Sequence, residues 1–267
     1  MHLSYYNMEF NPFSKEIETK NKYETEDFKL MKNRLEYIKE NPGIALFTGN
    51  AGLGKTFTIR EFLNSLNPNL YKTIYVTMSS VTVLEFYKEI AYSLGIEPAF
   101  KKIDLFRQIQ ETIIDYVKNK KIKVIICIDE AQYLKTNIIN DLKMLMNFDM
   151  DSKNYFTLIL IGQPILNSIL NRTLHEALRQ RITVSYNMLG LTKEEVYNYI
   201  NSRCKLAHSN EGIFNEQSKE AIFNSCNGSI RIVNNIVEKA LIIGYKKQTN
   251  TIDSETIMEA VNELALG

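Results

Sequence analysis

The stretch Gly49–Thr56 carries the clearest chemistry in this sequence. It reads GNAGLGKT and matches the whole phosphate-loop pattern GxxxxGK followed by Ser or Thr. In such a loop the glycines let backbone N–H groups point inward, and the N-terminus of the next helix adds positive potential. Lys55 would reach the β- and γ-phosphates, and the Thr56 hydroxyl would hold Mg²⁺. The residues predicted to contact the nucleotide are Gly49, Asn50, Ala51, Gly52, Leu53, Gly54, Lys55, Thr56 and Phe57.

The segments on either side of this loop suit the same chemistry. Residues 43–48 form a short apolar run with strand character, and residues 57–66 carry apolar side chains at helical spacing. A strand, a glycine-rich turn and a helix start together make an anion cradle. The alternative is a chance match in a glycine-rich loop. Such a match would not need a strand before it and a helix after it, so these flanking segments favour the phosphate loop. The chain is therefore expected to bind ATP together with Mg²⁺.

A pair of carboxylates supplies the second element that a phosphate loop needs. Asp129 and Glu130 directly follow the apolar run 124–128. A carboxylate at the end of such a strand faces the loop, so Asp129 is expected to orient the Mg²⁺ shell. Glu130 is expected to polarise the water that attacks the γ-phosphate. The alternative is a solvated strand end, and the preceding phosphate loop favours the catalytic interpretation.

Gln163 lies in a comparable position after the next apolar run. The segment reads Ile161-Gly162-Gln163-Pro164, and the strand that precedes Gln163 would lie beside the strand 124–128 that precedes Asp129. Gln163 is therefore a candidate sensor of the γ-phosphate or of the attacking water. Its alternative role is that of a turn residue before proline.

Three arginines are candidates for contacts with phosphate oxygens. Arg179 and Arg181 lie just before the last predicted strand, and guanidinium groups meet phosphates bidentately. Such a group can act in trans on a neighbour's nucleotide. Arg181 is the preferred candidate and Arg179 the second, with a solvated basic helix end as the alternative for both. Arg231, near a later helix start, could fold back onto the phosphates and couple nucleotide state to domain angle.

The wider pattern of the chain predicts the elements that would position these groups. Strand-like and helical segments alternate, which is typical of a parallel sheet covered by helices. The expected strands are residues 43–48, 72–78, 124–128, 156–161 and 182–186. Helical spacing fills residues 57–66, 83–94, 103–117 and 138–147. The fold class is therefore α/β, a phosphate-loop NTPase sandwich with a parallel sheet.

A small all-helical domain is expected to follow. Strand signals stop near Leu191, and the helical segments are residues 192–207, 215–226, 230–244 and 253–264. Asn215, Ser229 and Asp253 are candidate caps at three of their starts. The predicted domains are residues 1–190, with an N-terminal extension and first helix over 1–40, and a helical lid over 191–267.

Composition narrows the class of protein. The chain has 267 residues, of which 45% are hydrophobic and 24% charged, an ordinary globular balance. The net charge of +1 favours no particular partner, so an anionic partner would need a local patch. The three cysteines show no CxxC spacing, which indicates a reduced protein without a structural metal. No signal peptide or membrane-length apolar run is visible, so a cytoplasmic location without membrane insertion is expected.

Basic residues in two places are candidate contacts to nucleic acid. They lie before and within the stretch 103–117 and just after it: Lys101, Lys102, Arg107, Lys118, Lys120 and Lys121. A few phosphate contacts per subunit, repeated in an assembly, can support strong salt-dependent binding. The alternative for each cluster is an ordinary solvated face. No base-reading element is visible, so binding without sequence specificity is expected.

Taken together, these motifs resemble the AAA+ superfamily and, within it, the ExeA-like ATPases. The matching segments are an N-terminal NPF at 11–13, GNAGLGKT at 49–56, DEAQ at 129–132, IGQP at 161–164, LRQRI at 178–182 and GSIR at 228–231. The resemblance implies an AAA+ sandwich followed by a lid, and it adds Pro12 and Phe13 to the nucleotide site. Ile230 replaces the family's usual proline, and Asn50-Ala51 replaces Gly-Glu or Gly-Pro. Neither change removes a ligand group.

The resemblance leaves three functions open. Stand-alone members of this size look like transposition ATPases of the TnsC, TniB and MuB type, which implies an ATP-dependent homo-oligomer, ring or helical filament, on duplex DNA that recruits a transposase. Secretion-associated members carry a membrane span and a peptidoglycan-binding region that this sequence lacks, but a role with a secretion or envelope machine through protein partners is the alternative. A slow nucleotide-dependent signalling switch is the third, although the intact Glu130 argues against a switch without turnover.

Overall fold

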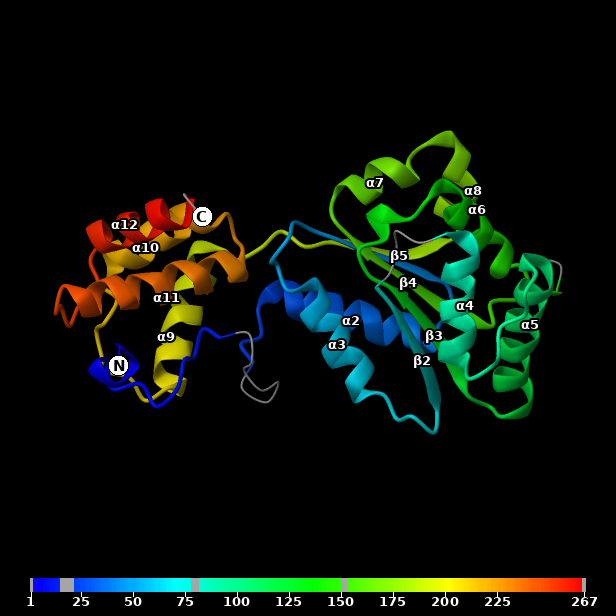
Figure 1. Ribbon diagram of the computed structural model, residues 1–267, viewed down its shortest axis with the longest axis horizontal. Helices are drawn as coiled ribbons and strands as arrows, with labels where there is room; N and C mark the ends of the chain where they lie inside the picture. Colours follow the sequence, from blue (N-terminus) through cyan, green and yellow to red (C-terminus); the bar gives the residue numbers. More distant parts are fainter. Residues whose placement is uncertain (1, 15–21, 78–81, 150–152, 266–267) are drawn as a thin grey trace. The chain divides into compact units, whose positions relative to one another are not determined.

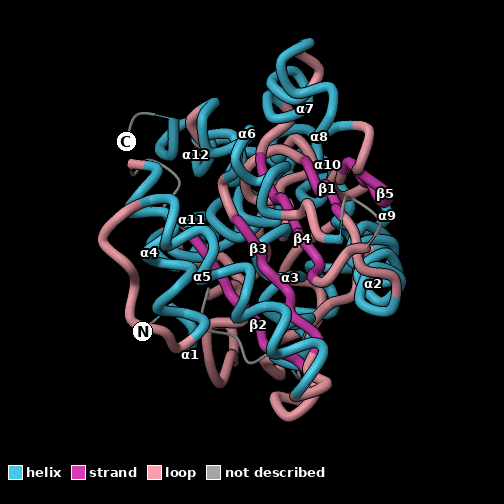
Figure 2. Tube along the Cα trace, turned by 90° about the vertical axis from the view of Figure 1, so that its right-hand side faces the viewer, coloured by secondary structure: helices cyan, strands magenta, loops and turns pink. Residues whose placement is uncertain are grey.

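The computed structural model describes residues 2–14, 22–77, 82–149 and 153–265 (Figures 1 and 2). Contacts divide the chain into two compact units. The α/β unit comprises Leu30–Gly49 and Lys55–Met188, and the helical unit comprises Met1–Lys29, Asn50–Gly54 and Leu189–Gly267. An independent domain at 191–267 stays a prediction. In the described part of the chain, no helix has both the length and the apolar character needed to cross a membrane.

The α/β unit is built on a five-stranded, all-parallel sheet in the order β2-β3-β4-β1-β5. Its strands are β1 Ile44–Thr48, β2 Tyr71–Val76, β3 Lys123–Ile128, β4 Phe156–Gly162 and β5 Ile182–Asn187. All seven residues of β4 and the last five of β3 are buried, which explains their continuous apolar runs. The predicted parallel sheet is thus confirmed. Its pairing aligns Ile128 with Leu160 and Thr48 with Gly162.

Helices cover both faces of this sheet. Residues on one face, among them Leu46, Ile126 and Leu158, share a core with helices α4 to α8. Helices α2 and α3 lie over the other face (Figure 1), and on that side the Arg34 guanidinium stacks over the Tyr186 ring. The bounds are α2 Glu26–Glu40, α3 Lys55–Ser65, α4 Val83–Leu94, α5 Lys102–Ile114, α6 Thr136–Leu145, α7 Ile165–Leu170 and α8 Glu176–Arg179.

Several helix bounds differ from the expectation by one or two residues, among them α6 at Thr136–Leu145 instead of 138–147, and two of the differences have a clear physical reason. α3 begins at Lys55, two residues earlier than expected, directly after Gly54 in the left-handed region at φ +99°. The stretch predicted as one helix over 103–117 is an α-helix only as far as Ile114, and it continues as the π-helix η2 Asp115–Asn119. A π turn holds one extra residue, and apolar spacing does not mark it.

The helical unit packs short helices around its own core. Its helices are α1 His2–Tyr5, α9 Lys193–Leu206, α10 Glu216–Cys226, α11 Ile230–Lys246 and α12 Ser254–Ala265. The predicted caps Asn215, Ser229 and Asp253 each accept a hydrogen bond from the backbone N–H three residues later. Tyr6 is fully buried in this core, where its hydroxyl donates to the Thr249 carbonyl. The predicted all-helical C-terminal region is confirmed.

Candidate active site

Lys55 opens helix α3 of the α/β unit and is almost fully buried. Its ammonium Nζ donates to the carbonyl of Gly49, 2.8 Å away, and only 6% of the residue is exposed. A lysine ammonium is rarely buried without compensation, so its burial here marks a position adapted to strong acceptors. This hydrogen bond directs the Lys55 side chain back toward Gly49, the first residue of the loop. The contact of Lys55 with the β- and γ-phosphates stays a prediction.

Asp129 is the meeting point of three donors at the end of β3. Its Oδ2 accepts from the hydroxyls of Thr56 and Tyr75, each at 2.7 Å, and its Oδ1 accepts from the Glu130 N–H. Only 4% of Asp129 is exposed. The predicted pair of Thr56 and Asp129 is therefore brought together. A hydroxyl and a carboxylate oxygen in contact fit Mg²⁺, which takes few protein ligands and fills its octahedron with phosphate oxygens and water.

Tyr75 belongs to this cluster, although no sequence motif predicted a role for it. Burial, and then its hydrogen bond to Asp129, raises the pKa of Tyr75 far above its usual value, so the phenol stays a donor. Tyr75 pairs with Cys127 across β2 and β3, which puts it level with the strand end before Asp129. Strand register, rather than any local motif, brings these two side chains together.

Glu130 and Gln163 are joined through a third side chain. Gln132, in the short 3-10 helix η3 Ala131–Tyr133, donates from Nε2 to the Glu130 carboxylate. Its Oε1 accepts from the backbone N–H of Gln163 at 3.0 Å. The two candidates after β3 and β4 therefore lie side by side, as the sequence predicts. Gln132 is part of the DEAQ segment, which offered the only sequence signal for it.

The two arginines before β5 differ in their surroundings. Arg179, the last residue of α8, is exposed, and its Nη1 lies 3.4 Å from Asn171 Oδ1. Arg181 is half-buried, and its Nη1 donates to the Lys143 carbonyl at 3.0 Å. Neither contact involves a residue predicted to bind nucleotide. A trans role for either one stays a prediction.

Within the helical unit, loop residues 50–54 lie against the start of α11. The N–H of Arg231 donates to the Gly52 carbonyl at 3.3 Å, and the Ser229 hydroxyl donates to the Ala51 carbonyl at 3.4 Å. Gly52 has φ +82°, and a Cβ there would lie 2.3 Å from Ser229 Oγ. Both the backbone conformation and the close approach require glycine. Arg231 itself is exposed.

The NPF segment lies in the helical unit. Pro12 and Phe13 are buried, and the Phe13 ring packs edge-on against Tyr199 in the helical core. Asn11 fixes the turn by accepting from the Phe13 N–H and donating to Glu238. These contacts give the segment a packing role, and its predicted contact with nucleotide stays a prediction.

The candidate DNA-contacting residues are all exposed, but half of them face carboxylates. Their ion pairs are Lys102 with Asp141 at 2.5 Å, Lys118 with Asp149 at 4.0 Å and Lys120 with Asp115 at 2.8 Å. Within the described residues, Lys101, Arg107 and Lys121 form no ion pair. These three therefore offer the less compensated charge for a phosphate backbone.

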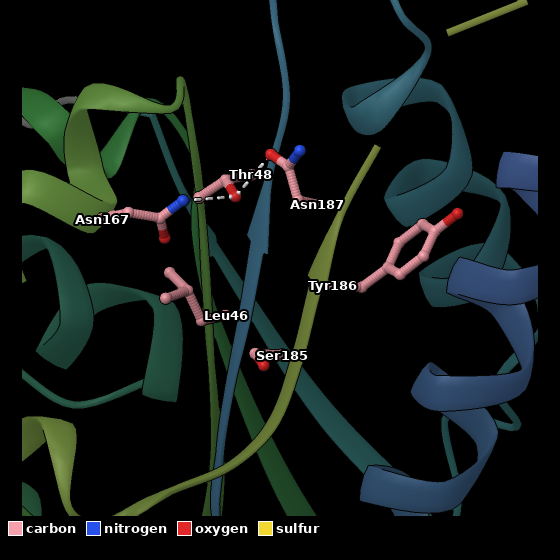
Figure 3. Close-up of a pocket in the computed structure, with 6 residues that line it drawn as sticks. All are labelled: Leu46, Thr48, Asn167, Ser185, Tyr186 and Asn187. Atoms are coloured by element: carbon pink, nitrogen blue, oxygen red, sulfur yellow. Dashed lines mark hydrogen bonds between the residues drawn. The ribbon is translucent and has the colours of Figure 1, made fainter. Parts of the chain in front are cut away.

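A small cavity of about 240 Å³, lined by both polar and apolar side chains, lies at the ends of β1 and β5. Figure 3 shows Thr48 between Asn167 of α7 and Asn187 of β5. Asn167 Nδ2 donates to the Thr48 hydroxyl, and that hydroxyl donates to Asn187 Oδ1, both at 3.1 Å. The network fixes the last residue of β1 directly before the phosphate loop begins at Gly49.

The family comparison agrees with this geometry. A family model described as an AAA domain matches residues 38–170, the part that holds Lys55, Asp129 and Glu130. Residues 38–170 are an AAA domain. The fold of the whole chain also matches that of Cdc6p from Pyrobaculum aerophilum, with a TM-score of 0.71 at 16% identity over 94% of this chain and 70% of that one.

Two curated relatives cover nearly the whole ATPase. General secretion pathway protein A of Aeromonas hydrophila is 28% identical over 99% of this chain, which spans 49% of that protein's length. The ATP-dependent target DNA activator B of Escherichia phage D108 is 24% identical over 91% of this chain and 73% of its own length. The chain is thus similar to proteins of two different systems.

Proposed function

We propose that this AAA+ ATPase forms ATP-dependent oligomers on duplex DNA and acts as a regulator of transposition, by selecting target DNA or recruiting a transposase. The observation that carries the proposal is its similarity, over 91% of the chain, to a phage protein whose name joins ATP dependence to target DNA. The exposed cations Lys101, Arg107 and Lys121 support it, since they offer phosphate contacts that no carboxylate in the described residues neutralises. Such contacts carry no sequence information, so binding to any duplex is expected.

The proposed hydrolysis uses the cluster at the ends of β3 and β4. Thr56 and Asp129 would hold Mg²⁺, which shields the phosphate charge, and Lys55 would bind the β- and γ-phosphates. Glu130 would accept a proton from the water whose oxygen bonds to the γ-phosphorus as the bond to ADP breaks. Gln163 would help to orient that water. In the oligomer, Arg181 or Arg179 would reach the neighbour's site, and Arg231 would respond to the bound nucleotide.

Binding to a long random duplex tests the DNA assignment. The parent protein should bind at low salt with ATP or a slowly hydrolysed analogue, form rings or filaments visible by electron microscopy, and dissociate as salt rises. Lys55→Ala is the matched control, because it removes a proposed contact with the nucleotide and leaves the exposed cations unchanged. If DNA binding depends on ATP, this variant should lose it. DNA binding by the Lys55→Ala variant equal to that of the parent, or no binding by the parent in any nucleotide state, contradicts the proposal.

A second function is favoured by one observation. General secretion pathway protein A matches 99% of this chain at higher identity than the phage protein. An ATPase that drives a secretion or envelope machine through protein partners would need Lys55 and Glu130 but not the exposed cations Lys101, Arg107 and Lys121. ATP hydrolysis that is unaffected by duplex DNA, together with failure of the binding test above, would favour this function.

A further inference from the structure

The chain turns sharply where β3 ends. Glu130 adopts a left-handed conformation, with φ 50° and ψ 38°, which residues with a side chain rarely adopt. The next residues form η3, which lies against β4 and α7. This turn directs the chain toward the end of the neighbouring strand β4, whose last residue is Gly162 and which is followed by Gln163. A strained residue at a candidate catalytic position calls for a structural reason.

The side chain of Gln132 supplies such a reason because it contacts both strand ends. Its Oε1 accepts from the Gln163 N–H at 3.0 Å, and its Nε2 donates to the Glu130 carboxylate. The two partners fix the orientation of the amide: the Gln163 N–H can only donate, and an ionised carboxylate can only accept. A hydrogen bond to a carboxylate is charge-assisted, so it orients the Glu130 side chain more strongly than a bond between two neutral groups would.

The backbone of β4 leaves room for this bridge. A Cβ at Gly162 would lie 2.5 Å from Gln132 Oε1 and 3.0 Å from Leu166 Cδ2. Gly162 is buried as the last residue of β4 and pairs with Thr48 at the end of β1. Any larger residue there would displace the Gln132 amide from Gln163. Glycine at 162 and glutamine at 132 therefore form one matched arrangement.

We propose that Gln132 is a positioning residue, which holds the Glu130 carboxylate in its working orientation and couples it to the backbone of the Gln163 segment. A shift of residues 162–164 would then reorient Glu130 through one side-chain amide. The inference rests on the proposed role of Glu130 as the general base. It assigns to Gln132 no contact with nucleotide or water, so its effect appears in turnover and not in binding.

The first test separates turnover from binding in Gln132→Ala. We expect kcat to fall by roughly 10- to 100-fold, the effect of misplacing a reacting group by about 1 Å. KM and the affinity for a fluorescent ATP analogue should stay within about twofold of the parent, since no proposed ligand is lost. Gln108→Ala is the matched control. The Gln108 amide makes the same kind of bridge, from the Ala99 N–H to the Glu97 carbonyl, but on helix α5. Its loss should leave both quantities unchanged.

Two further variants keep the test independent of folding defects. Gln132→Glu retains the acceptor for the Gln163 N–H but places a second carboxylate beside Glu130, so kcat should fall at least as far as in Gln132→Ala. Gly162→Ala leaves both side chains intact and should imitate Gln132→Ala by steric displacement. Unchanged binding of the ATP analogue in each variant establishes that the fold is retained.

A double-mutant cycle decides between positioning and a general structural role. In a Glu130→Gln background there is no base left to position, so adding Gln132→Ala should not lower the residual rate further. Multiplicative losses in the double variant, or a kcat for Gln132→Ala equal to or above that of the parent, would overturn the inference. Glu130→Gln that hydrolyses ATP like the parent would instead refute the base assignment, and the inference with it.

Discussion

At the scale of single residues, the acceptor oxygens of Asp129 organise the end of β3. Two hydroxyls share Oδ2, and the Thr56 hydroxyl is one of them. If Thr56 turned to a bound Mg²⁺, Tyr75 would be the side-chain donor among the described residues that still orients the Asp129 carboxylate. Tyr75 would therefore orient Asp129 for the proposed Mg²⁺ contact, although it is not itself a proposed ligand.

Tyr75→Phe tests this role. The Mg²⁺ concentration for half-maximal ATP binding should rise several-fold, because one charge-assisted hydrogen bond, worth about 1.5–3 kcal/mol in general, no longer orients Asp129. Nucleotide binding measured in EDTA should not change. The measurement is a titration of Mg²⁺ against a fluorescent ATP analogue. Tyr71→Phe is the matched control on the same strand, since its hydroxyl donates to Glu40 instead. An identical Mg²⁺ requirement in the two variants would contradict the role.

At the scale of elements, the continuous apolar runs predicted β3 and β4 correctly because buried parallel strands need apolar residues on both faces. Side-chain neighbours such as Tyr75 with Asp129, or Gln132 with Gln163, could not be predicted. They depend on strand register and on the left-handed turn at Glu130, which leave no local pattern. The ion pair between Lys102 and Asp141 could likewise not be predicted from the sequence, because it joins the start of α5 to a different helix, α6.

That ion pair gives the basic start of α5 a sharp test. Lys101→Ala should weaken duplex binding and lower the slope of log affinity against log salt by about 1, because it removes a cation that forms no ion pair with any described residue. Lys102→Ala should have a smaller effect, since Asp141 already offsets its charge. Affinities measured between low and moderate salt check both slopes. Equal losses in the two variants, or a loss only in Lys102→Ala, would show that the ion pair does not govern the contact.

At the scale of the whole molecule, the proposed oligomer makes each active site depend on two subunits. Arg181→Ala should leave nucleotide binding by the single subunit largely intact while it stops hydrolysis. Mixing Arg181→Ala with Glu130→Gln should recover part of the activity, since some interfaces then join an intact base to an intact arginine. ATP turnover across mixing ratios is the measurement.

Arg179→Ala is the matched variant in that experiment. Arg179 is the more exposed of the two, whereas Arg181 is engaged with the Lys143 carbonyl. Recovery with Arg179→Ala subunits, and none with Arg181→Ala subunits in assemblies of normal size, would move the trans role to Arg179. Recovery with neither would assign both arginines to the fold of their own subunit.

The strand order also determines when each strand can pair during synthesis of the chain. β1 lies inside the sheet, yet both strands that flank it, β4 and β5, are the last two to leave the ribosome. The backbone hydrogen-bonding groups of β1 therefore lack their strand partners until β4 and β5 are synthesised, whereas β2 and β3 can pair earlier. Long-range parallel pairing of this kind folds slowly and exposes intermediates to aggregation. Nascent chains that stop before Phe156 should accordingly engage chaperones, and release should follow synthesis of β4.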